Sequence, residues 1–276
     1  VFVSLNYRLG IFGWLDVSVL GGEEYRGSHS HGLLDQITAL RWIKDNIASF
    51  GGDANNITVM GESAGSIDLS WLLSNGHLKG IAKRVVLMSG IAGLIGLSGD
   101  LSHGFTEEYS QQDAKGLLEK LDIRSMEDLL LRSTKDLMDK MVGIVRNTDT
   151  LFYMDSIFWP RVSDFTPVDP FRAVEQYNDT DIEVIIGYTG YEMGLWLTWD
   201  ENLDQHSSDW AAGKIQDFKT DETKRSATSL YETVLPLEPD GRRALHMIGD
   251  SIFVAPSLWF AEKLAEKNVP TWVFQF

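Results

Sequence analysis

The segment 61–65, with the sequence Gly-Glu-Ser-Ala-Gly, constrains the fold of this chain more than any other part of it. It follows the apolar run 57–60 and precedes residues 66–73, which favour a helix. A serine on so tight a strand-to-helix turn needs nearly side-chain-free neighbours two positions to either side, and its strained backbone lifts the hydroxyl clear of the sheet. The pattern therefore predicts that Ser63 is a nucleophile and that the N–H of Ala64 points to where an oxyanion would form.

Short apolar strands that alternate with helical stretches predict an α/β fold with a mostly parallel sheet. Apolar residues at spacings of three and four from Leu33 to Phe50 predict a helix that ends at Gly51-Gly52. Leu and Met at helical spacing predict inserted helices at about 105–146, covering one end of the sheet. Four further segments read as strands: 1–5, 84–88, 182–186 and 272–276. We expect residues 1–276 to form a single, incomplete domain.

Composition excludes several classes of function. The 24 basic and 40 acidic residues give a net charge of −16, and no Lys/Arg cluster stands out, so nucleic acid is not an expected partner. The absence of cysteine excludes disulfides, thiolate metal sites and a cysteine nucleophile. No apolar run approaches the length of a membrane span. The compartment, cytoplasmic or secreted, and the oligomeric state stay open.

Several motifs occur in a fixed order around the pentapeptide. They are Asn6-Tyr7-Arg8-Leu9-Gly10, Gly32-Leu33-Leu34-Asp35-Gln36, Ala39-Leu40-Arg41-Trp42, Asn46-Ile47, Phe50-Gly51-Gly52-Asp53 and Gly61-Glu62-Ser63-Ala64-Gly65. In this order and at this spacing they resemble the type-B carboxylesterase/cholinesterase family of α/β-hydrolases. The resemblance is dense from Val1 to about Gly90 and thinner to Phe276. It implies a serine esterase that needs no metal or cofactor and acts on small-molecule esters.

The resemblance also implies a triad acid. A serine hydroxyl needs a histidine to take its proton and a carboxylate to orient that histidine, and in this fold the acid precedes the histidine. Glu192 follows the strand 182–186 within a Gly-rich segment, where such a sheet places catalytic groups. It resembles the acid of the family, although a solvated loop glutamate would fit the same pattern.

No histidine in the chain matches the catalytic base of the family. Only His206 and His246 follow the acid: the first reads as an exposed loop residue and the second as a packed helix residue. Four precede it: His29, His31, His77 and His103. The family histidine follows a strand that resembles 272–276, so we expect it beyond Phe276. The His-Gly-Gly oxyanion loop is expected upstream of Val1. We therefore expect both ends to be missing and the 276-residue piece to be inactive alone.

Other positions resemble supporting residues of the family. Ser89 resembles the serine that bonds the triad acid, although it reads equally as a turn serine. Arg8 and Asp35 resemble a buried ion pair of the family, whose role would be structural. Glu62 resembles a position that acts on the electrostatics of the site, although a merely structural carboxylate fits as well. The resemblance also implies that a group of aromatic residues lines an apolar gorge over the serine, although packing in the core fits each of them equally: Phe152, Tyr153, Phe158, Trp159, Trp196 and Trp199.

Two other functions compete with the esterase. The chain could be a non-catalytic adhesion or binding member of the same fold, although such members usually lose the nucleophile or a partner, and Ser63 and Glu192 are both present. It could also be an α/β domain with a fortuitous motif, which the ordered block of matches disfavours.

Overall fold

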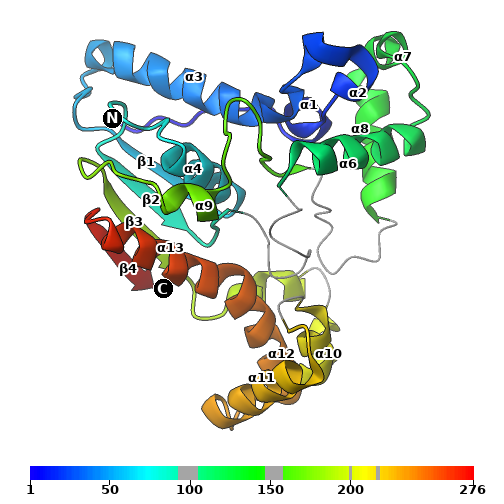
Figure 1. Cartoon of the computed structure of the whole chain (residues 1–276), viewed down its shortest axis with the longest axis vertical. Coiled ribbons are helices and arrows are strands. Elements are labelled where there is room, and N and C mark those ends of the chain that lie inside the picture. Colours follow the sequence, from blue (N-terminus) through cyan, green and yellow to red (C-terminus); the bar gives the residue numbers. More distant parts are fainter. Residues whose placement is uncertain (93–104, 147–157, 199–200, 216–217) are drawn as a thin grey trace. The chain divides into compact units, whose positions relative to one another are not determined.

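The chain divides into two compact units in the computed structural model, and Figure 1 labels its helices and strands. One unit comprises Val1–Gly52 and Ser102–Asp169, and the other comprises Asp53–Leu101 and Pro170–Phe276. The residues described are 1–92, 105–146, 158–198, 201–215 and 218–276. The second unit carries the pentapeptide and a four-stranded sheet.

The sheet is parallel throughout, as the sequence predicts. Its strands lie in the order β1-β2-β3-β4, and every neighbouring pair is parallel. The bounds are β1 (Thr58–Glu62), β2 (Arg84–Met88), β3 (Glu183–Tyr188) and β4 (Thr271–Gln275). The strand expected at 1–5 does not form: residues 1–9 have no regular secondary structure. A strand exists only through hydrogen bonds to a neighbour, and the described sheet gives this segment none.

The register places the carboxyl ends of three strands side by side. Glu62 pairs with Met88, and Met88 pairs with Gly187. Gly187 in turn pairs with Phe274, and a Cβ at Gly187 would lie 2.1 Å from the Phe274 ring, so a larger residue at this position would displace that ring. The residues that follow β1, β2 and β3 therefore emerge at one edge of the sheet, where parallel sheets hold their functional groups.

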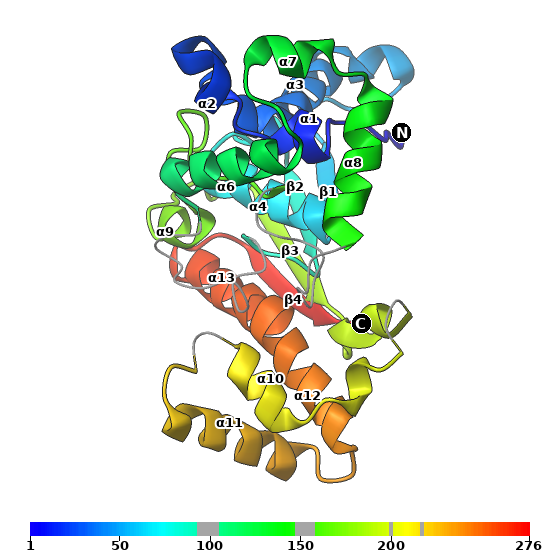
Figure 2. The same ribbon diagram turned by 90° about the vertical axis from the view of Figure 1, so that its right-hand side faces the viewer.

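Three helices form a layer on this sheet (Figure 2). Helix α4 (Ala64–Ser74) packs against β1 and β2, and α13 (Ala255–Glu266) packs against β3 and β4. The short α9 (Pro170–Val174) contacts both of these helices. Every residue of α4 from Ser66 to Ser74 is buried, which is typical of a core helix.

A long helical run leads into α13. It begins with α12 (Asp240–Gly249) and passes through a π-helical segment, η7 (Asp250–Val254). The run Asp240–Glu266 is long and apolar enough to cross a membrane by length and composition, but 61% of that window is buried inside the structure. Packing of α13 against the sheet makes this a core helix. The other described helices of this unit are η5 (Glu192–Thr198), η6 (Leu203–Gln205), α10 (Ser208–Lys214) and α11 (Asp221–Val234).

The first unit is helical in its described residues. Helix α3 (His31–Asn46) continues as η3 (Ile47–Phe50) and ends at Gly51, whose φ of 81° is left-handed, as the Gly-Gly pair predicts. The region predicted to be helical contains α6 (Glu107–Lys120), α7 (Met126–Leu131) and α8 (Thr134–Arg146). The short helices α1 (Gly10–Trp14), α2 (Ser18–Gly21), η1 (Gly22–Tyr25) and η2 (Ser28–Ser30) precede them. Side chains of α1, α6 and α8 share one buried apolar cluster.

Candidate active site

Ser63 has the backbone that the pentapeptide predicts. Its φ of 51° and ψ of −117° lie in a region that L-residues rarely adopt, which costs on the order of 1–3 kcal/mol. The Ser63 N–H donates to the Met88 carbonyl at 2.8 Å, so the turn is tied to the end of β2. The strained backbone of Ser63 is thus held by its hydrogen bond to the end of β2, as expected where the position of the Ser63 side chain is important.

The two glycines that flank Ser63 in the motif, Gly61 and Gly65, differ in whether the structure leaves room for a side chain. A Cβ at Gly61 would lie 2.4 Å from the Gly65 carbonyl oxygen, so this position requires glycine. A Cβ at Gly65 would meet nothing within 4 Å among the described residues, so the expectation that both flanking positions are sterically restricted is wrong for Gly65. The tight contact comes from Gly90 instead, where a Cβ would lie 2.6 Å from the Ser63 carbonyl oxygen.

Ala64 is the first residue of α4, and Ser63 is the N-cap. The first N–H groups of a helix have no acceptor within it, and the helix dipole adds positive potential at this end. The first bond of the helix joins the Ile67 N–H to the Ser63 carbonyl at 3.0 Å. The Ala64 N–H, as the first of this helix, therefore has no acceptor within it, and its role toward an oxyanion stays a prediction.

Glu192 lies just past β3, as the first residue of η5. Its Oε1 accepts a hydrogen bond from Ser89 Oγ at 2.9 Å and another from the Thr189 N–H at 2.6 Å. Ser89 follows β2 and is fixed in turn, because its N–H donates to the Gly187 carbonyl at 2.8 Å. The contact between Ser89 and Glu192 is the one that the resemblance implied. One carboxylate oxygen is thus held by two donors, which fixes the direction of the side chain.

The histidines do not complete this arrangement. Among those the structure describes, none is hydrogen-bonded to Ser63 or Glu192. His206 stacks on Trp210 with ring centroids 3.8 Å apart, and His246 of α12 lies 4.8 Å from the Tyr191 ring. Both rings thus pack against aromatic side chains, as the sequence predicted for His246. The expectation that His206 is an exposed residue is wrong, because it is half-buried against Trp210. His103 lies outside the described residues.

Arg8 and Asp35 form the predicted ion pair but are not buried. The Arg8 guanidinium donates to both carboxylate oxygens of Asp35 at 2.7 Å, and these contacts hold the pKa of Asp35 below its usual value. The side chains are 48% and 26% exposed, so the expectation of a buried pair is wrong in this structure. Solvent screening makes the contribution of such a pair to stability small. Glu62, the last residue of β1, is exposed, and its role stays a prediction.

The predicted aromatic group is only partly within the described residues, because Phe152, Tyr153 and Trp199 lie outside them. Phe158 packs against the apolar cluster of the first unit, which is the core-packing interpretation. The Trp196 ring of η5 lies 5.6 Å from that of Phe253. Trp159 is half-buried.

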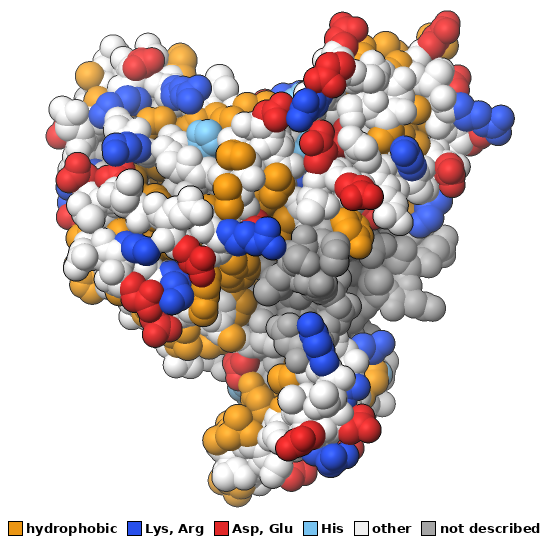
Figure 3. Space-filling model, viewed as in Figure 1, with side chains coloured by type: hydrophobic (Ala, Val, Ile, Leu, Met, Phe, Trp, Pro, Cys, Tyr) orange, Lys and Arg blue, Asp and Glu red, His pale blue; other side chains and the backbone are white. Residues whose placement is uncertain are grey.

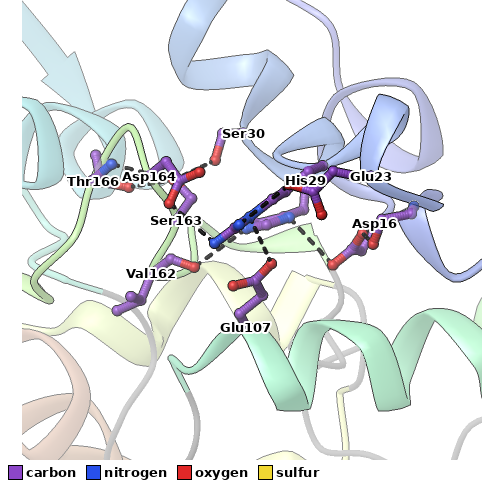
Figure 4. A network of polar contacts seen from close by, with 11 residues as sticks. Asp16, Glu23, His29, Ser30, Glu107, Val162, Ser163, Asp164 and Thr166 are labelled. Atoms are coloured by element: carbon purple, nitrogen blue, oxygen red, sulfur yellow. Dashed lines mark hydrogen bonds and ion pairs between the residues drawn. The ribbon is translucent and has the colours of Figure 1, made fainter.

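A buried polar network in the first unit was missed by the sequence analysis (Figure 4). His29 and Asp16 are both 1% exposed, and His29 Nδ1 lies 3.4 Å from Asp16 Oδ2. His29 Nε2 lies 3.3 Å from the Val162 carbonyl oxygen, so the ring joins two segments distant in sequence. Nearby, Arg26 pairs with Glu23, Glu107 and Asp164. No periodicity or motif in the sequence signals these contacts.

Among the described residues no hydroxyl group is hydrogen-bonded to His29, whose two ring nitrogens face Asp16 and the Val162 carbonyl. The flanking serines are engaged elsewhere: Ser28 Oγ accepts from the Val17 N–H at 2.9 Å, and Ser30 Oγ donates to Ser163 Oγ at 2.9 Å. Burial is the largest single influence on Asp16 and raises its pKa, but the combined contacts with His29 and Ser18 outweigh it and lower the pKa. The pair therefore has the properties of a structural contact.

The Asp16→Asn variant should be destabilised at neutral pH by about 1–3 kcal/mol, because it removes a charged hydrogen-bonding partner from a buried site. A carboxyl whose pKa is lowered by folding stabilises the fold above its unfolded pKa of 3.8, and this stability is lost as the pH falls through the folded value. The difference in unfolding free energy between wild type and variant should therefore be constant near pH 6 and shrink below about pH 4. Urea unfolding at a series of pH values measures it, and a difference that grows in acid would contradict the assignment.

Comparison with known proteins assigns the chain to a family. The carboxylesterase family model matches residues 1–276, and the chain belongs to that family. It is 30% identical over its whole length to para-nitrobenzyl esterase of Bacillus subtilis (strain 168), covering 52% of that protein. It is 28% identical to phenmedipham hydrolase of Pseudarthrobacter oxydans, again over its whole length and 52% of the relative. The chain thus spans about half the length of these relatives.

Solved structures agree with the fold. The chain superposes on carboxylesterase EST55 of Geobacillus stearothermophilus at pH 6.2 with a TM-score of 0.80 and 26% identity, over 98% of this chain and 54% of that one. A structure of PNB esterase gives a TM-score of 0.71 and 28% identity, over 98% and 54%. The fold is that of an α/β-hydrolase, as the sequence predicted.

Proposed function

We propose that this protein hydrolyses carboxylic esters through an acyl-enzyme on Ser63, with Glu192 as the acid that orients the catalytic base. The observation that carries this proposal is that the Ser63 and Glu192 side chains are both held in place within the second unit. Ser63 is held in a strained turn after β1, and Glu192 is fixed after β3 by hydrogen bonds from Ser89 and Thr189. Membership of the carboxylesterase family supports the same chemistry.

The reaction begins when Ser63 Oγ attacks the ester carbonyl carbon and a base takes the hydroxyl proton. The base is a histidine outside the described residues, since no described histidine is bonded to Ser63 or Glu192. The negative charge that develops on the carbonyl oxygen is stabilised by the Ala64 N–H at the start of α4. When the C–O bond to the alcohol breaks, the base returns its proton to the alkoxide oxygen.

Water completes the cycle. The base takes a proton from the water, the resulting hydroxide attacks the acyl carbon, and Ser63 Oγ leaves with the proton returned to it. The Glu192 carboxylate stabilises the imidazolium that forms in each half-reaction. This chemistry requires no metal or cofactor.

Substrates of the proposed enzyme are small esters. The names of two relatives refer to a para-nitrobenzyl ester and to phenmedipham, so a para-nitrobenzyl ester and a short-chain aryl ester are suitable first substrates. Acidic and basic side chains are interspersed on the face drawn in Figure 3.

The test is active-site labelling of the protein expressed from its full coding sequence. A fluorophosphonate reacts with a serine only when that serine is activated by a base, so it should label Ser63 stoichiometrically and abolish hydrolysis of both esters. Mass spectrometry of the labelled peptide identifies the residue. A folded protein that neither reacts nor hydrolyses esters would instead favour the non-catalytic binding member of the fold.

A further inference from the structure

One face of the α12–η7 helix packs against the segment that carries Glu192. His246, Gly249 and Phe253 are spaced three and four residues apart and so share a face. The rings of His246 and Tyr191 lie 4.8 Å apart, and those of Phe253 and Trp196 lie 5.6 Å apart. Gly249 lies between these two aromatic contacts. The helix therefore supports the acid segment on both sides of Glu192.

Gly249 is the point of closest approach. A Cβ at this position would lie 3.3 Å from Glu192 Cβ and 3.3 Å from Met193 Cγ. Met193 is fully buried, so its side chain has little room to move away. Helix α12 ends at Gly249, and the wider π-helical turn begins at Asp250. The missing side chain thus lets the helix lie directly against the stem of Glu192.

The helix is held more firmly than the acid segment. Tyr231 of α11 donates a hydrogen bond to Asp250 Oδ2 at 2.6 Å, which anchors the residue directly after Gly249. The continuation of the same helical run, α13, packs against β3 and β4. By contrast, η5 is a single 3₁₀ segment of 7 residues with Leu195 54% exposed. A group added at Gly249 would therefore displace Glu192 rather than the helix.

We propose that Gly249 is a positioning residue for the triad acid: its lack of a side chain sets how far the Glu192 carboxylate reaches toward Ser89 and the Thr189 N–H. This inference rests on the proposed function for its effect on catalysis, but the placement of Glu192 can be measured separately. Displacement of Glu192 by a few tenths of an ångström lengthens the 2.6 Å hydrogen bond from Thr189. It also misdirects the carboxylate that orients the base.

The test is Gly249→Ala in the protein expressed from its full coding sequence, with Gly116→Ala as the matched control. Gly116 lies within α6, and a Cβ there would meet nothing within 4 Å among the described residues. Alanine favours a helix more than glycine does at both positions. The thermal midpoint of Gly116→Ala should therefore equal or exceed that of the wild type, and the thermal midpoint of Gly249→Ala should change little. The kcat for ester hydrolysis should fall about tenfold in Gly249→Ala with KM nearly unchanged, since misplacement of catalytic groups acts on the transition state. The control should keep the wild-type kcat.

Hydrogen exchange at the Thr189 amide provides the readout that does not depend on activity. Exchange should be faster in Gly249→Ala and unchanged in Gly116→Ala, because only the first lengthens the bond from this amide to Glu192. Unchanged exchange overturns the inference, whether or not the protein proves to be an esterase. Absence of esterase activity in the wild type overturns the proposed function, while faster exchange still supports the positioning role. If Gly249→Ala does not fold, Tyr231→Phe provides a second variant, because it removes the hydrogen bond that anchors the helix at Asp250 without adding volume. Faster exchange at the Thr189 amide and a lower kcat in Tyr231→Phe would then support the positioning role of the helix. Unchanged exchange and kcat would overturn it.

Discussion

Replacement of Ser63 by alanine should abolish ester hydrolysis while the fold is retained. Loss of the nucleophile removes the acyl-enzyme route, which typically lowers kcat by several orders of magnitude. Alanine leaves the strained backbone of φ 51° in place, since both residues carry a Cβ, so the thermal midpoint should change little. Steady-state kinetics with a short-chain aryl ester, together with thermal unfolding, measures both effects.

The control for this variant is Ser226→Ala, which replaces an exposed serine of α11 in the same unit. It should keep wild-type kcat and KM. Fluorophosphonate labelling should disappear in Ser63→Ala and persist in Ser226→Ala. Retention of more than a few per cent of the wild-type rate by Ser63→Ala would show that another residue is the nucleophile.

Local patterns predicted the sheet well because the strands are short apolar runs with clear boundaries. All four observed strands lie within two residues of a predicted segment. The segment 1–5 has the same composition but forms no strand, because a strand depends on a neighbour that composition does not reveal. Gly61 and Gly65 look equivalent in the motif, but among the described residues a Cβ would meet backbone atoms at Gly61 and nothing within 4 Å at Gly65.

Groups of the candidate site were predictable where a motif or a strand end places them. Ser63, Ser89 and Glu192 each follow a strand, and the register of β1, β2 and β3 aligns these ends. Burial was not predictable, since the Arg8–Asp35 pair forms but is partly exposed. Contacts such as His29 with Val162, 133 residues apart, leave no local signal. The close approach of Gly249 to Glu192 likewise depends on how two distant segments pack.

Replacement of Glu192 by glutamine separates the charge of this residue from its shape. The amide oxygen of glutamine can accept the bonds that Ser89 Oγ and the Thr189 N–H donate to Oε1, so the side chain should keep its place. The negative charge that stabilises the imidazolium is lost, and kcat should fall by about ten-thousand-fold with little change in KM. Glu232→Gln, on the exposed surface of α11, makes the same change in net charge and should leave both constants unaltered. Steady-state kinetics of both variants measures the effect. A rise in KM at constant kcat would mean that Glu192 contacts the substrate and that another carboxylate orients the base.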